Sequence, residues 1–193
     1  MTFGRLVRAA EGRPAPWKNG RGTTVEIAVG PVGAGFDDFD WRVSRATIAA
    51  DGPFSTLQGV DRGFAPLDGS GVRLTVEGRG TVALRPGSPP FEFDGGAAAV
   101  ARLIDGPVTA LNVMTRRGRC AHRLFLHGEG PLAPAAGFAA ALVCLGETAR
   151  LRGGPELRRL DTLVAEDGRW PDWSVEAAPG GCLVALIVAA ARS

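Results

Sequence analysis

The chain has 193 residues, including 28 glycines and 14 prolines, and 45% of its residues are hydrophobic. This length can form one large domain or two small ones, and so much glycine and proline disfavours a helical bundle and favours an all-β protein. The hydrophobic content excludes a disordered chain, and a formal net charge of only +2 gives no sign of a nucleic-acid-binding surface.

The cysteines and the apolar runs indicate in which cellular compartment the protein is expected. Cys120, Cys144 and Cys182 form no CxxC motif, which is typical of reduced thiols rather than disulfides. The first residues lack the apolar core of a signal peptide, and the longest apolar run, 183–191, is about half of a membrane span. We therefore expect a cytoplasmic protein that binds neither nucleic acid nor a membrane.

Segments that alternate polar and apolar residues recur between glycines and prolines, and this period predicts strands. Before Gly118 the predicted strands are 23–29, 41–49, 63–69, 71–78, 81–87, 100–106 and 108–117. After it they are 120–128, 138–151, 157–167, 173–178 and 182–193. The repeated pattern predicts two barrels or sandwiches packed together, 1–118 and 119–193.

The histidines argue against a metal centre. His122 and His127 are the only two, and a spacing of five on a strand places them on opposite faces. The cysteines are dispersed, and no GxSxG elbow is present. We expect no metal and no cofactor.

The segment 17–24 contains Trp17, Lys18 and Asn19. Lys18 is the only lysine of the chain, and Asn19 and Asn112 are its only asparagines. The lysine precedes the glycines and a strand follows them, an order that does not fit a phosphate-binding P-loop. The glycines indicate a turn into a strand, and the role of Lys18 stays open.

Two further segments are predicted to present polar side chains on a strand face. In 41–49, Arg42 and Ser44 share a face with small residues, as a cavity wall requires. In 108–117, Asn112, Met114 and Arg116 share a face. A polar ligand could satisfy a buried Asn112. Met114 is a candidate for the same site, although a methionine on a barrel wall most often serves packing. Arg116 is interpreted as a solvated strand end.

Between these two segments lie Phe54, Ser55, Asp61 and Arg62, in turns at 53–55 and 59–62. Asp61 beside Arg62 is consistent with a surface ion pair. Alternatively, Asp61 orients Arg62 toward a ligand carboxylate, which an arginine binds with two parallel hydrogen bonds.

Three blocks together resemble the HutD/Ves family: PWKNGRGTTVEIA (16–28), WRVSRATIAADGPFSTLQGVDR (41–62) and ALNVMTRRG (110–118). The resemblance covers the first two thirds of the chain. Arg21 stands where the family motif has glycine, and Gln58 where it often has proline. The resemblance implies a bicupin, two antiparallel jelly-roll barrels, and a metal-free accessory protein of bacterial histidine utilisation.

We therefore expect a regulatory protein that senses or buffers a small acidic metabolite, urocanate or N-formylglutamate. Arg42 and Arg62 would hold its carboxylate. Asn112, Ser44 and Ser55 would bind polar groups, with Phe54 and Trp17 as apolar walls. Lys18 and Asn19 would cover the entrance.

Two alternatives remain open at this point. One is a metal-independent enzyme that acts on a small carboxylic acid, with Asp61 or Lys18 as general base. The other is an interaction module, such as a homodimer, that uses the apolar C-terminal barrel as its interface.

Overall fold

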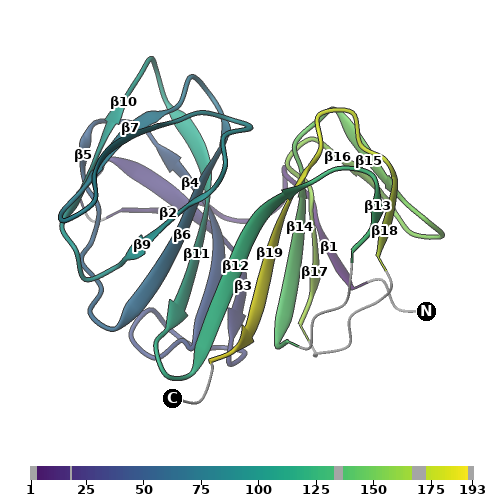
Figure 1. The fold of residues 1–193 in the computed structure, drawn as a ribbon, viewed down its shortest axis with the longest axis horizontal. Helices are drawn as coiled ribbons and strands as arrows, with labels where there is room; N and C mark the ends of the chain where they lie inside the picture. Colours follow the sequence, from purple (N-terminus) through teal and green to yellow (C-terminus); the bar gives the residue numbers. More distant parts are fainter. Residues whose placement is uncertain (1–3, 18, 133–136, 167–172, 191–193) are drawn as a thin grey trace. The chain divides into compact units, whose positions relative to one another are not determined.

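The computed structural model describes residues 4–17, 19–132, 137–166 and 173–190, and within them it contains strands and turns but no helix (Figure 1). The all-β expectation is confirmed. No helix long and apolar enough to cross a bilayer occurs in these ranges. The chain divides into two compact units, which we call the first unit (Arg13–Cys120) and the second unit (Met1–Gly12 with Ala121–Ser193).

The first unit consists of two antiparallel sheets. The larger has the order β2 (Ala15–Pro16), β3 (Gly22–Gly30), β4 (Trp41–Ile48), β11 (Val108–Arg116), β6 (Val60–Asp68), β9 (Phe91–Asp94). The smaller has the order β5 (Gly52–Pro53), β10 (Ala99–Leu103), β7 (Val72–Val76), β8 (Gly80–Leu84). Ile48 and Phe64 of the larger sheet share one buried cluster with Leu74 and Val76 of the smaller, so the two sheets face each other.

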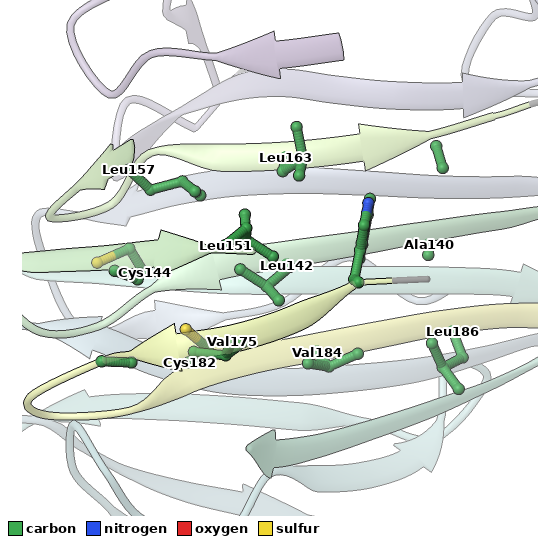
Figure 2. Close-up of a cluster of buried hydrophobic side chains, with 14 residues drawn as sticks. Ala140, Leu142, Cys144, Leu151, Leu157, Leu163, Val175, Cys182, Val184 and Leu186 are labelled. Atoms are coloured by element: carbon green, nitrogen blue, oxygen red, sulfur yellow. The ribbon is translucent and has the colours of Figure 1, made fainter. Parts of the chain in front are cut away.

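The second unit repeats this arrangement. Its larger sheet has the order β1 (Arg5–Val7), β17 (Thr162–Ala165), β14 (Ala139–Cys144), β19 (Cys182–Ala189), β12 (Cys120–His127). Its smaller sheet has the order β13 (Gly130–Pro131), β18 (Ser174–Ala177), β15 (Thr148–Leu151), β16 (Glu156–Arg158). The interior is filled by apolar side chains from both sheets, among them Leu142, Leu157, Leu163 and Val184 (Figure 2).

The beginning of the chain differs from the expected division at residue 118. β1 pairs with β17, with Arg5 opposite Val164, so residues 4–12 belong to the second unit. Ala9 N also donates to Asp161 Oδ1 at 2.8 Å. Alternation within a segment cannot reveal a partner strand so distant in the sequence.

Several strand boundaries also differ. β9 was not predicted, and β6 begins at Val60, so the expected turn at 59–62 is largely strand. The segments 138–151 and 157–167 each contain two strands instead of one. Val60–Arg62 escaped the prediction because Gly59 and Gly63 on either side suggest a turn.

Candidate functional site

The first unit contains a cavity of about 570 Å³. Its walls come from the larger sheet, from Trp17 and Asn19 after β2, from Phe36 and Asp37 between β3 and β4, and from β5 and the segment after it. The lining residues are Ala15, Pro16, Trp17, Asn19, Thr24, Phe36, Asp37, Arg42, Ser44, Ala46, Ile48, Pro53, Phe54, Ser55, Leu57, Arg62, Phe64, Asn112 and Met114.

The sheet register arranges the polar lining residues in rows. Met114 of β11 lies between Arg42 of β4 and Arg62 of β6. In the next row, Asn112 lies opposite Ser44. Side chains two residues apart on a strand share a face, so the faces predicted for β4 and β11 both line the cavity.

Arg62 is the centre of this wall. Its side chain is buried, and its guanidinium carbon lies 4.9 Å from the ring centroid of Phe54 and 5.1 Å from that of Phe93. Its Nη2 donates to Asn112 Oδ1 at 3.1 Å, and Nη1 makes a long contact of 3.4 Å with the carbonyl oxygen of Ser55. Two aromatic faces and two neutral oxygens thus hold one cation.

The charge of Arg62 is not balanced by an acid. Within the described ranges no carboxylate forms an ion pair with it, and its Nε is buried without a hydrogen-bond partner. Burial lowers the pKa of Arg62 to about 10, so the group is still protonated at neutral pH. A buried charge without a counter-charge is costly, and an anion in the cavity would relieve that cost.

Asn112 and Ser44 extend the polar wall. Asn112 Oδ1 accepts from Arg62, so its Nδ2 is left to donate toward the cavity that the residue lines. Ser44 is buried and also lines the cavity. A carboxylate at Arg62 would therefore meet amide and hydroxyl groups as neighbouring donors.

Arg42, in contrast, already has a partner. Its Nε donates to Glu26 Oε2 at 3.0 Å, and its guanidinium carbon lies 5.4 Å from the ring centroid of Phe36. Arg42 therefore adds less positive charge to the cavity than the sequence suggested.

The entrance residues are partly engaged as well. Trp17 Nε1 donates to Thr24 Oγ1 at 2.7 Å, and Asn19 Oδ1 accepts from the backbone N–H of Arg21 at 3.0 Å. Both line the cavity, and Asn19 is exposed. Lys18 lies outside the described residues.

Asp61 does not line the cavity, which corrects the expected site. Adjacent residues on a strand point to opposite faces, so Asp61 points away from Arg62. Asp61 Oδ1 accepts from Arg117 Nε at 2.8 Å, and nearly half of the Asp61 side chain is exposed. Neither the Asp61–Arg62 pair nor a general base at Asp61 in the cavity is present.

Sequence reasoning missed residues that hold the site together. Phe93 lies on the unpredicted β9, and Arg117 pairs with both Asp61 of β6 and Asp94 of β9. Arg116 is not a solvated end: it donates to the carbonyl oxygens of Phe39 and Asp37 at 3.0 Å, beside the cavity residue Phe36. The available signal in the sequence was the pair Arg116–Arg117 at the end of β11.

No three His, Cys, Asp or Glu side chains gather at metal-binding distance within the described residues. The absence of a bound metal stays a prediction.

A family model described as HutD matches residues 9–185. An uncharacterized 21.2 kDa protein in the hutC 3' region of Pseudomonas putida is 38% identical over 120 residues, 62% of each chain. Protein Ves of Citrobacter koseri is 41% identical over 105 residues, 54% of this chain and 53% of that protein. The matched segments thus span between half and two thirds of these relatives.

Two solved structures resemble the fold. HutD from Pseudomonas fluorescens SBW25, in its formate condition, is 29% identical, with a TM-score of 0.83 over 97% of this chain and 99% of that one. A cupin 2 conserved barrel domain protein from Leptotrichia buccalis is 13% identical, with a TM-score of 0.55 over 98% of both chains. The second likeness supports the bicupin fold alone.

Proposed function

The chain belongs to the HutD family, and from this premise we propose that it is a binding protein for a small carboxylic acid. The acid would enter the cavity of the first unit and place its carboxylate against Arg62. The observation that carries the proposal is the buried guanidinium of Arg62, held between Phe54 and Phe93 without an acidic partner.

The ligands that we propose are urocanate and N-formylglutamate, acidic intermediates of histidine breakdown, which the protein would sense or buffer. Support comes from the family and from the relative in the hutC 3' region. Urocanate has one carboxylate and N-formylglutamate has two. Arg42, two strands away from Arg62, is the candidate for the second carboxylate, in exchange for its contact with Glu26.

An enzymatic role receives no such support. Of the two expected general bases, Asp61 points away from the cavity and pairs with Arg117, and Lys18 lies outside the described residues. The groups that contact Arg62 are an amide oxygen, a backbone carbonyl oxygen and two aromatic rings, which bind and orient but do not shuttle protons at neutral pH. Asp37 is the carboxylate among the described lining residues, and it forms no ion pair with Arg62.

Calorimetric titration of the purified protein tests the proposal. We expect both acids to bind, and urocanamide, the neutral amide of urocanate, to bind far more weakly. Arg62→Ala should weaken acid binding by about 2–5 kcal/mol, or roughly 30-fold and more. Arg62→Lys should recover little, because an ammonium cannot make two parallel hydrogen bonds.

Arg85→Ala is the matched control, because Arg85 is an exposed arginine outside the cavity lining that donates to the carbonyl oxygen of Ser70. Its affinity for the acids should equal that of the wild type. Equal affinity of Arg62→Ala and wild type for an acid that binds would contradict the proposal.

A further inference from the structure

Two segments of the first unit form the rim of the cavity. Between β2 and β3, Trp17 and Asn19 line the cavity, and the segment after Gly52 contributes Pro53, Phe54 and Ser55. Asn19, Pro53 and Ser55 are exposed, and the two aromatic rings are half-buried, as expected of a rim.

Arg21 connects these two segments. Its side-chain Nη1 donates to the backbone carbonyl oxygen of Asp51, and its own carbonyl oxygen accepts from Ala49 N at 2.9 Å. The side chain lies across Gly52: a Cβ built there would come within 2.6 Å of Arg21 Nη1 and 2.7 Å of its Cδ. Glycine at 52 is therefore what allows the arginine to reach Asp51.

The contact between Arg21 and Asp51 is linked to Arg62 through the backbone of residues 51–54. β5 is held on one side by β10, with Phe54 N donating to the carbonyl oxygen of Ala99 at 2.8 Å. Arg21 adds a contact to the same segment at the carbonyl oxygen of Asp51, whose Oδ1 also accepts from Leu103 N at 2.7 Å. Phe54, three residues on, is one of the two rings that stack on Arg62. The Arg21 contact therefore restrains the segment that carries this ring.

We propose that Arg21 is a positioning residue that fastens the rim of the cavity and thereby slows the entry and exit of ligands. The effect on ligands rests on the proposed function of the cavity. The contact between Arg21 and Asp51 does not depend on that function. Arg21 is exposed, so its contact with Asp51 can open without unfolding the barrel. Glycine, which the family motif has at this position, cannot make the contact.

The first test needs no ligand. Hydrogen exchange of the apo protein should be faster in Arg21→Ala at the amides of Gly20 and Phe54, by about 3- to 10-fold, the value of one hydrogen bond. Arg21→Lys keeps a long stem and a donor and should restore slower exchange. Arg85→Ala removes a comparable arginine–carbonyl bond elsewhere and should leave both amides unchanged.

Stopped-flow measurements with urocanate and N-formylglutamate form the second test. Association and dissociation should both accelerate by about 3- to 10-fold in Arg21→Ala, with a smaller change in affinity. Unchanged exchange at Gly20 and Phe54 would overturn the fastening, and faster exchange with unchanged ligand rates would overturn the effect on entry. If the wild type binds neither acid, the proposed function fails, and hydrogen exchange alone decides the role of Arg21.

Discussion

Each of the two units contains one buried charged side chain among the described residues, Asp161 in the second unit and Arg62 in the first, and their surroundings differ sharply. Asp161 accepts from Arg8 Nη1 at 2.8 Å, from Ala9 N at 2.8 Å and from Arg158 N at 3.0 Å. Arg62 meets an amide oxygen, a distant carbonyl oxygen and two aromatic rings. The carboxylate of Asp161 is thus balanced by a cation and two backbone amides, whereas the guanidinium of Arg62 has no acidic partner among the described residues.

The interiors differ in the same sense. The second unit fills the space between its sheets with leucine, valine and cysteine side chains (Figure 2). Burial raises the pKa of the Cys182 thiol there to about 12, with a further contribution from Cys144, so this thiol stays protonated and inert. The first unit leaves a cavity beside its unbalanced charge.

The two buried charges differ in whether the fold itself supplies a counter-charge. Asp161 ties the start of the chain to the second unit, and its partners are all part of the fold. Arg62 is buried without a carboxylate partner among the described residues, and under the proposed function the ligand would supply the opposite charge.

The largest expected effect on stability concerns Asp161. Asp161→Ala removes the carboxylate that accepts from the amides of Ala9 and Arg158, at about 1–3 kcal/mol each, so the free energy of unfolding should fall by about 2–6 kcal/mol. Denaturant unfolding measures it. A loss below about 0.5 kcal/mol would show that the hydrogen bonds and ion pair of Asp161 stabilise the fold little. That result would contradict the difference between Asp161 and Arg62.

A smaller effect depends on pH. Burial alone would raise the pKa of Asp161, but hydrogen bonds from Arg158 N, Ala9 N and Arg8 outweigh it and lower the pKa below its ordinary 3.8. The stabilisation from the ionised form is therefore complete above the ordinary pKa and is lost as the pH falls through the lower folded value. Asp161→Asn should be less stable than the wild type at pH 7, and the difference should shrink below pH 3.8. A pH-independent difference in unfolding free energy would contradict this assignment.

Local alternation was enough to predict most of the fold and one wall of the site. It placed Arg42 and Ser44 on one face of β4, and Asn112 and Met114 on one face of β11. It failed where the partner strand is distant in the sequence, as for β1, which pairs with β17. It also failed where a strand is short: β9, which carries Phe93, has only four residues between a Pro–Pro and a Gly–Gly pair.

The ion-pair partners of the arginines could not be predicted from the sequence either. Asp61 and Arg62 are neighbours in sequence, but on a strand their side chains point to opposite sides. Asp61 therefore pairs with Arg117, 56 residues away. Glu26 likewise becomes the partner of Arg42 through the pairing of β3 with β4. A sequence pattern can select candidate cations, but only the sheet register shows which of them lacks a counter-charge.

The most direct test measures how much urocanate and N-formylglutamate stabilise the wild type and Arg62→Met against unfolding. Methionine keeps the bulk and removes the charge, so the ligand-free variant should be as stable as the wild type, or more stable by about 1–4 kcal/mol. An acid at 100 times the wild-type dissociation constant should add about 2.7 kcal/mol to the wild type and less than about 1 kcal/mol to the variant, if the variant binds at least about 30-fold more weakly. Equal stabilisation of both proteins by the acid would contradict the assignment of Arg62 as the carboxylate-binding group.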